Sequence, residues 1–273
     1  MELFFRKSGA GDPFVILHGL YGSSDNWYSV ARDLSSEFTV YLIDQRNHGN
    51  SPHHPEHNYD VMSEDLEVFL EKHTIHKPVI LGHSMGGKTA LAFGLKHPEM
   101  VSKMIVVDIS PLGYGKHHHS PEHAIHERII HALLSIQPDI LTSRDEADML
   151  LQKSIALPAI RQFLLKNLKR KPDGGFYWAL NLQAIADNLS AIFAGVIPEI
   201  RSDQNVPRFP LLFIKGEYSG YIKKHDEKAI HDFFPWALIE TIHGAGHWVH
   251  AEQPAALLKT VRDFIHMKTD AIR

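Results

Sequence analysis

The alternation of short apolar runs with helical segments constrains the fold of this chain more than any other feature. Runs rich in β-branched residues and leucine are bounded by turn residues. We predict buried strands at Phe14 to Leu17, Thr39 to Ile43, Val79 to Leu81 and Met104 to Val107. We predict helices between them at Asp25 to Leu34, Asp60 to Lys72 and Met85 to Lys96. This order is typical of an α/β fold, a mostly parallel sheet flanked by helices on both faces.

The end of the chain returns to the same pattern. Two further strands are predicted at Leu211 to Ile214 and Leu238 to Ile242, with a helix near Lys223 to Phe233 between them. Pro254 suits the first turn of a helix that runs to about Met267.

Residues 110–207 differ from the rest, because they contain helical patterns interrupted by prolines and no convincing strand. We therefore predict a core of residues 1–109 and 208–273, with a helical cap at 110–207 inserted before the last two strands. The cap follows a strand of a parallel sheet, so we expect it to rise from the carboxyl edge, where such sheets bind ligands. The stretch Arg170 to Gly175 is expected to be a solvated turn within the cap.

Composition excludes several classes of protein. The 273 residues are 44% hydrophobic and 22% charged, which is ordinary globular usage, and the net charge of -4 argues against a nucleic-acid partner. Because the chain has no cysteine, it has no disulfide, thiolate metal site or cysteine nucleophile. No apolar run approaches the length of a membrane span. We expect a cytoplasmic protein, a monomer or homodimer, that does not bind membranes.

The strongest chemical motif is Gly82-His83-Ser84-Met85-Gly86. It comes directly after one predicted strand and directly before a predicted helix, the context that a G-x-S-x-G nucleophile elbow requires. A sharp strand-to-helix turn exposes the middle side chain, and the flanking glycines leave room for that turn. Ser84 is therefore the predicted nucleophile, in preference to an incidental serine in a glycine-rich turn.

A serine nucleophile needs a base, and Gly244-Ala245-Gly246-His247 places a histidine in a loop of small residues after the last predicted strand. His247 is the predicted base, because it falls last in the order serine, acid, histidine that this kind of fold uses. His243 and His250 are the alternatives. Neither lies at the tip of the glycine loop.

An oxyanion formed by attack on a carbonyl needs preorganised donors, which are usually backbone N–H groups. The N–H of Met85 follows the nucleophile, and the turn His18-Gly19-Leu20 offers the N–H of Leu20. We expect His18 to fix that turn. The segment Asp44 to Ser51 could form an ion or phosphate site, but a hydrogen-bonded turn at the pocket edge is favoured.

The motifs together resemble those of the α/β-hydrolase superfamily, and within it those of the YbfF-type esterases. The resemblance runs nearly from end to end of the chain. It is carried by HGLYGSS at His18 to Ser24, DQRNHGNSP at Asp44 to Pro52, GHSMGGK at Gly82 to Lys88, VDISP at Val107 to Pro111, GAGHWVHAEQP at Gly244 to Pro254, and cap residues including Gln162 to Lys166, Phe176, Trp178 and Asn181. The resemblance implies hydrolysis of acyl esters, and in some relatives of acyl-CoA thioesters, without a cofactor.

The acid of the triad is the point at which the chain departs from most of the superfamily. Most members carry it after the strand predicted here at Leu211 to Ile214, where this sequence has Ser219 at the expected position. Asp108 follows the preceding strand, and the YbfF-type esterases resemble this sequence in carrying their acid there. Asp108 is the predicted acid, and Glu217 is its main rival.

The 21 histidines and the tryptophans raise two further questions. His119, His123 and His126 fall on one face of a helix, but no acidic or cysteine partner is placed to complete a metal site, so we predict none. The role of the histidine-rich segment from His117 to His131 stays open. Trp27, Trp178 and Trp248 are candidates for an acyl pocket, although buried aromatic residues are more often core.

The residues predict a serine hydrolase that cleaves carboxylic esters of short to medium acyl chains through an acyl-enzyme. The alternatives are an acyl-CoA thioesterase, a perhydrolase or C–C hydrolase on the same site, and an inactive binding protein on the same scaffold. The family pattern shows arginine near the position of Lys116 and His117, which weakens the case for a leaving group that carries phosphate. Dehalogenases and epoxide hydrolases are excluded, because they need an aspartate at position 84.

Overall fold

A seven-stranded sheet forms the centre of the computed structural model, which describes residues 1–114, 121–197 and 208–267. The strands lie in the order β1-β3-β2-β4-β5-β8-β9. β1 is antiparallel to β3, and the other neighbours are parallel. The strands are β1 (Phe5–Ser8), β2 (Asp12–Leu17), β3 (Phe38–Ile43), β4 (Val79–His83), β5 (Lys103–Val107), β8 (Leu211–Gly216) and β9 (Leu238–Ile242).

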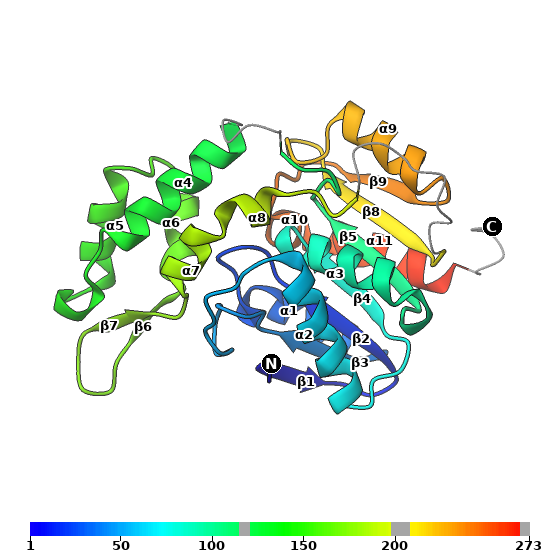
Figure 1. The fold of residues 1–273 in the computed structure, drawn as a ribbon, viewed down its shortest axis with the longest axis horizontal. Helices are drawn as coiled ribbons and strands as arrows, with labels where there is room; N and C mark the ends of the chain where they lie inside the picture. The colour runs from blue at the N-terminus through cyan, green and yellow to red at the C-terminus, as the bar shows by residue number, and fades with distance from the viewer. Residues whose placement is uncertain (115–120, 198–207, 268–273) are drawn as a thin grey trace.

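Helices cover both faces of this sheet (Figure 1). Strand side chains alternate between the faces. In β2, Phe14 and Ile16 join the core cluster of α1 and α11, whereas Val15 and Leu17 join that of α2, α3 and α9. The helices of the core are α1 (Tyr28–Leu34), α2 (Tyr59–Lys72), α3 (Met85–Lys96), α9 (Lys224–Phe233), α10 (Val249–Glu252) and α11 (Pro254–His266), with 3-10 turns η1 (Ser24–Trp27) and η2 (Pro98–Met100).

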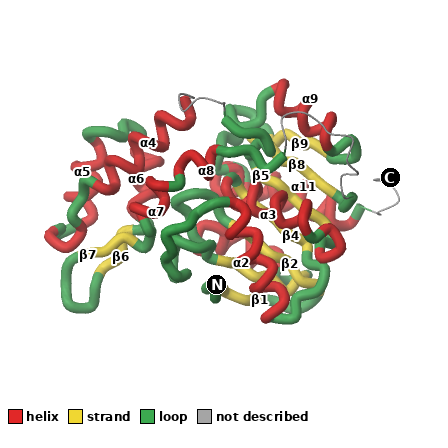
Figure 2. Tube along the Cα trace, in the orientation of Figure 1, coloured by secondary structure: helices red, strands yellow, loops and turns green. Residues whose placement is uncertain are grey.

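The insertion between β5 and β8 forms a separate lobe beside the sheet (Figures 1 and 2). A third apolar cluster fills it and includes Leu20, Tyr21 and Met85 of the core, so the lobe packs onto the loop after β2 and the start of α3. Its elements are α4 (Pro121–Leu134), η3 (Pro138–Ile140), α5 (Arg144–Gln152), α6 (Pro158–Leu165), β6 (Leu168–Arg170), β7 (Phe176–Trp178), α7 (Leu182–Asp187) and α8 (Leu189–Phe193).

The α/β-hydrolase fold predicted from the sequence is confirmed, but three strands were missed. β1 is an edge strand of sequence FRKS whose pairing partner is β3, and its polar side chains hide the strand pattern. β6 and β7 have three residues each and pair antiparallel with one another around an exposed turn that includes Lys171 and Gly174. The prediction of an insertion without strands was therefore wrong.

No helix in the described parts of the chain is long and apolar enough to cross a membrane.

Candidate active site

Ser84 lies at a sharp turn between β4 and α3. Its backbone has φ 52° and ψ -120°, a left-handed conformation that a residue with a side chain rarely adopts. The turn is tight: a Cβ atom on Gly82 would lie 2.2 Å from the carbonyl oxygen of Gly86, and one on Gly86 would lie 2.5 Å from that of Leu17. Glycine is therefore required on both sides of Ser84.

Asp108 follows β5, the strand beside β4, and also has positive φ (52°). Its side chain is fully buried. Oδ1 accepts a hydrogen bond from the backbone N–H of Gly216 at 2.9 Å, and Oδ2 accepts one from the hydroxyl of Ser219 and one from Nδ1 of His247 at 2.7 Å. These donors satisfy the charge of a carboxylate that is removed from water.

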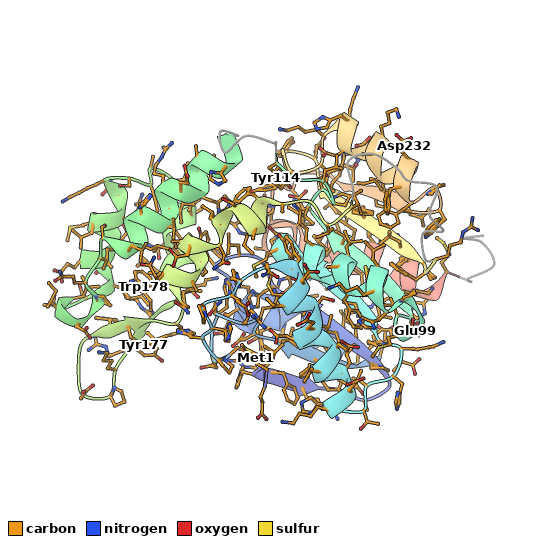
Figure 3. All side chains as sticks on the ribbon, viewed as in Figure 1. Met1, Glu99, Tyr114, Tyr177, Trp178 and Asp232 are labelled. Carbon is orange, nitrogen blue, oxygen red and sulfur yellow. The ribbon has the colours of Figure 1, made fainter. Side chains whose placement is uncertain are left out.

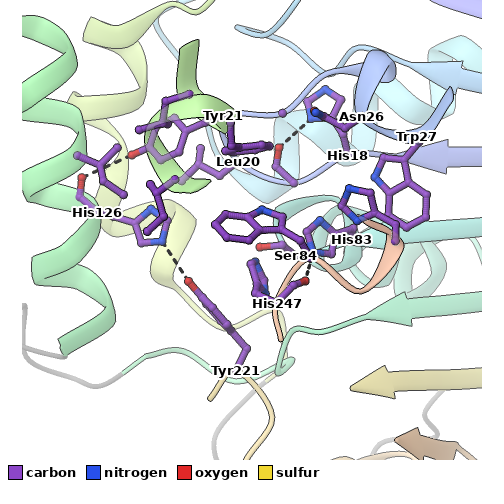
Figure 4. Close-up of a pocket in the computed structure, with 18 of the residues that line it drawn as sticks. His18, Leu20, Tyr21, Asn26, Trp27, His83, Ser84, His126, Tyr221 and His247 are labelled. Atoms are coloured by element: carbon purple, nitrogen blue, oxygen red, sulfur yellow. Dashed lines mark hydrogen bonds between the residues drawn. The ribbon is translucent and has the colours of Figure 1, made fainter. Parts of the chain in front are cut away.

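His247 reaches Asp108 from the loop after β9. Its Nδ1 is occupied by the carboxylate, so Nε2 is the ring nitrogen that is left for Ser84, and both residues line one cavity (Figure 4). The imidazole of His83 donates through Nε2 to the carbonyl oxygen of His247 at 2.9 Å. The structure thus brings together the predicted nucleophile, base and acid from three separate loops.

The two predicted oxyanion donors lie at the same edge of the sheet. Met85 is the first residue of α3, so its N–H has no acceptor within the helix. Among the described residues, neither this N–H nor that of Leu20 has a hydrogen-bond acceptor. His18 fixes the second donor's turn, as expected: its Nδ1 donates to the carbonyl oxygen of Gly19 at 2.9 Å, and its Nε2 accepts from the N–H of Gln45 at 3.0 Å.

The segment from Asp44 to Ser51 forms the favoured hydrogen-bonded turn. Asp44 is buried, and its carboxylate accepts hydrogen bonds from the N–H groups of Ser24 at 2.6 Å and Asn50 at 2.9 Å. A Cβ atom on Gly49 would lie 2.2 Å from this carboxylate. The aspartate therefore organises its own loop.

A cavity of about 230 Å³ lies above Ser84 and between the core and the insertion. The insertion contributes an apolar wall made of Ile125, Ile129, Ile160, Phe163 and Leu164. The described residues that line the cavity include several histidines and tyrosines but no lysine, arginine, aspartate or glutamate. The cavity suits an uncharged, partly apolar molecule.

Two of the three tryptophans proposed for the acyl pocket line the cavity in the described structure, and the third does not. Trp27 and Trp248 line the cavity, whereas Trp178 is not among the described residues that do. Trp178 belongs to β7 at the outer part of the insertion (Figure 3), where it packs against the apolar cluster of that lobe. Its assignment to the pocket was wrong, because the β6-β7 hairpin carries it away from the sheet edge.

The residues considered as alternatives to the predicted base and acid are His243, His250 and Glu217, and their contacts give them other roles. The side chain of His243 is 83% exposed and lies 3.4 Å from Glu217. Glu217 also accepts a hydrogen bond from the N–H of Gly244, and this bond together with His243 lowers its pKa. His250 does line the cavity, but its ring stacks on Trp27 and burial lowers its pKa to about 3.

The histidine-rich segment is only partly described. His119 lies outside the described residues. The ring of His123 packs edge-on against Phe193, and His126 bonds to Tyr221. No group of three potential metal ligands occurs in the described ranges.

Tyr221 and His126 also line the cavity, although the sequence analysis did not single out Tyr221 and considered His126 only as a metal ligand. Tyr221 follows β8 and its ring stacks on His247, and His126 belongs to α4 of the insertion. No local motif marks either residue, because their contacts arise only when the insertion packs on the core.

A serine at a strained strand-to-helix turn, beside a histidine and a carboxylate on later loops, is typical of serine hydrolases. A family model described as alpha/beta hydrolase fold matches residues 12–137. A zebrafish (Danio rerio) protein named sn-1-specific diacylglycerol lipase ABHD11 is 38% identical over 267 residues, which are 96% of this chain and 80% of that protein. Esterase YbfF of Escherichia coli is 33% identical over 256 residues, 93% of each chain. The solved structure of a marine microorganism esterase is 46% identical, with a TM-score of 0.91 over 96% of this chain and 99% of that one.

The chain belongs to the α/β-hydrolase superfamily and has YbfF-like relatives. It is a serine hydrolase of the esterase type. The family, the fold and the enzyme class predicted from the sequence are thereby confirmed.

Proposed function

We propose that Ser84, His247 and Asp108 form the catalytic triad and that Leu20 and Met85 supply the oxyanion hole. His247 takes the proton of Ser84 as the serine attacks the acyl carbon, and then returns it to the leaving alcohol. Water hydrolyses the acyl-enzyme by the same route. The observation that supports this proposal is that His247, whose Nδ1 is hydrogen-bonded to the buried carboxylate of Asp108, lines the same cavity as Ser84.

The proposed substrate is a small uncharged ester with a short to medium acyl chain. A cavity of about 230 Å³ with an apolar wall suits a short to medium acyl chain better than a long one. The absence of charged residues from the described lining favours an ester over an acyl-CoA thioester, whose leaving group carries phosphates. Perhydrolysis, C–C cleavage and an inactive scaffold remain the alternatives that experiment must separate.

We also propose that residues 110–207 act as a cap on a core of residues 1–109 and 208–273. The contribution of this insertion to the cavity wall supports that division. A cytoplasmic location agrees with the lack of cysteine. Cofactor independence, a monomeric or homodimeric state and the lack of a nucleic-acid partner stay predictions.

Replacement of Ser84 tests the proposal. We expect Ser84→Ala to abolish hydrolysis of p-nitrophenyl esters and covalent labelling by a fluorophosphonate probe, because both reactions need the serine oxygen. Ser36→Ala changes an exposed serine outside the cavity and should behave as wild type. Circular dichroism checks the fold of each variant. Labelling of Ser84→Ala at the wild-type rate would contradict the assignment, and an unlabelled, inactive wild type would favour the binding-protein alternative.

A further inference from the structure

The ring of Tyr221 lies flat against the predicted base. The centroids of the Tyr221 and His247 rings are 4.0 Å apart and the ring planes are inclined by 25°, which is a stacked pair. The ring of His83 approaches the same imidazole at 4.7 Å. His247 is therefore flanked by two rings, in addition to its hydrogen bond with Asp108.

Tyr221 is itself held by contacts at both ends. Its backbone N–H donates to the hydroxyl of Ser219 at 3.2 Å, and that hydroxyl donates to Asp108. Its carbonyl oxygen accepts a hydrogen bond from the hydroxyl of Tyr114 at 3.4 Å. The loop that carries the ring is thus tied to the acid of the predicted triad.

The far end of the Tyr221 side chain meets the insertion. The phenol oxygen shares a hydrogen bond of 3.1 Å with Nε2 of His126, which belongs to α4 (Figure 4). The ring of His126 stacks on Tyr21 with centroids 5.7 Å apart. A row of contacts therefore runs from the loop after β2, through the insertion, to His247.

We propose that Tyr221 is a positioning residue that holds the ring of His247 in line with Ser84, and that His126 of the insertion fixes Tyr221 in turn. One hydrogen bond from Nδ1 to Asp108 sets the position of a ring edge, but it leaves the ring free to rock about that bond. A flat partner at stacking distance removes this freedom. The inference rests on the proposed function, because it assigns Tyr221 to the base of that triad.

The arrangement makes the activity depend on the insertion. If α4 moves away from the core, the phenol of Tyr221 loses its hydrogen bond with His126 and the stacked ring is less constrained. The insertion then acts on proton transfer as well as on the shape of the acyl pocket.

The first test compares Tyr221→Leu with Tyr218→Leu in the full chain. Tyr218 lies on the same loop, is 76% exposed and lies outside the described cavity lining, so its replacement is a matched control. We expect Tyr221→Leu to lower kcat for a p-nitrophenyl ester and the fluorophosphonate labelling rate about 10- to 100-fold, because small errors in the alignment of reacting groups are costly. KM should change less than about threefold. Tyr221→Phe keeps the stacked ring and should lose less activity than Tyr221→Leu.

A kcat of Tyr221→Leu within about twofold of Tyr218→Leu, or a loss confined to KM, would overturn the positioning role. Thermal unfolding of each variant checks that the fold persists. If Tyr221→Leu does not fold, the comparison of Tyr221→Phe with His126→Phe tests by itself whether Tyr221 and His126 act together on His247.

This second comparison is a double-mutant cycle. Each variant removes the same hydrogen bond, so we expect each to lower kcat by a similar factor of about 2 to 10, and the double variant to be no slower than either. Losses that multiply in the double variant would show that His126 does not act through Tyr221.

If the wild type neither hydrolyses esters nor reacts with the probe, the proposed function fails first. An active wild type with unaffected variants leaves that function intact and refutes only this inference.

Discussion

The carboxylate of Asp108 accepts three hydrogen bonds, and each of them limits how it can turn. The hydroxyl of Ser219 occupies one site on the carboxylate oxygen that also binds His247. Ser219 stands where most of the superfamily carries the acid, and here its hydroxyl donates to Asp108, the proposed acid, which follows the neighbouring strand. In the proposed triad the carboxylate therefore comes from the residue after β5, and the usual position supplies a hydrogen-bond donor to it.

Asp108→Asn is predicted to lower kcat by orders of magnitude, because an amide cannot stabilise the imidazolium or select the reactive tautomer. The corresponding change in a serine protease of unrelated fold costs about 10⁴ in kcat. Glu217→Gln and Ser219→Ala should change kcat by less than about tenfold. Ester hydrolysis kinetics measure all three. A severe loss in Glu217→Gln with a mild one in Asp108→Asn would place the acid after β8 instead.

His57 makes stability depend on pH. Its side chain is buried beside Asn47 and His48, and burial and the charge of Arg46 lower its pKa from 6.5 to about 3. The unfolded chain therefore binds a proton that the folded chain excludes as the pH falls from 6.5 towards 3. Stability from this group is complete above pH 6.5 and is lost below it, by about 1.4 kcal/mol per pH unit.

His57→Leu isolates this contribution, because leucine has no proton to take up. Urea unfolding at pH 7.5, 6.5, 5.5 and 4.5 should show a variant that is less stable than wild type at neutral pH, with a gap that narrows on acidification. His76→Leu, at an exposed loop site, is the matched control and should keep a constant difference from wild type. A gap for His57→Leu that stays constant below pH 6.5 would refute the prediction.

Lys88 of helix α3 joins the start of the insertion to the segment that follows α8. Lys88 is fully buried, and its Nζ donates to the carbonyl oxygens of Leu112 at 2.9 Å and Ala194 at 2.7 Å. Leu112 precedes the insertion's first helix and Ala194 follows its last. The two segments also pair with each other, since the N–H of Val196 donates to the carbonyl oxygen of Pro111.

Lys88→Met is predicted to loosen the insertion. Methionine fills a similar space but removes the donor to the partly buried carbonyl oxygens of Leu112 and Ala194. A typical hydrogen bond contributes about 0.5 to 1.5 kcal/mol to stability. We expect a lower melting temperature and faster proteolytic cleavage within the insertion. Lys96→Met, on the exposed side of the same helix, removes a surface pair with Asp60 and should have little effect. Equal cleavage rates in the two variants would contradict this role.

The elements that the sequence predicted well are those whose pattern is local. Strands such as Val79–His83 are continuous apolar runs buried on both faces, and Ser84 follows from the glycines around it. The β6-β7 hairpin could not be predicted in this way, because three-residue strands have too few positions to show alternation. Tyr221 acquires its place only from the contact between two distant segments.

The chain is rich in charged residues, but the described lining of its cavity contains no lysine, arginine, aspartate or glutamate. The chain carries 28 Lys and Arg and 32 Asp and Glu residues, yet none of them is among the described residues that line the cavity. Histidines do line it, but burial keeps the pKa of His83 and His250 low, so these two are neutral at pH 7. The described lining of the cavity therefore offers hydrogen bonds and apolar surface without a fixed charge, and the carboxylate of Asp108 lies behind His247.

This distribution predicts selectivity at both ends of the substrate. We expect kcat/KM for a p-nitrophenyl ester of four to eight carbons to exceed that for the matching acyl-CoA by at least about tenfold, because no cation in the described lining offsets the desolvation of phosphate. Esters of sixteen carbons and long-chain diacylglycerols should be poorer still, since their chains exceed a cavity of about 230 Å³. Ile129→Trp, in the apolar wall, should narrow the accepted length further, whereas Leu157→Trp, at an exposed site outside the described lining, should not. Hydrolysis rates for these substrates, measured at one ionic strength, give the ratios of kcat/KM. A higher kcat/KM for acyl-CoA or for long-chain diacylglycerol than for the short p-nitrophenyl ester would contradict the prediction, and would show that the cavity opens or extends beyond its present walls when substrate binds.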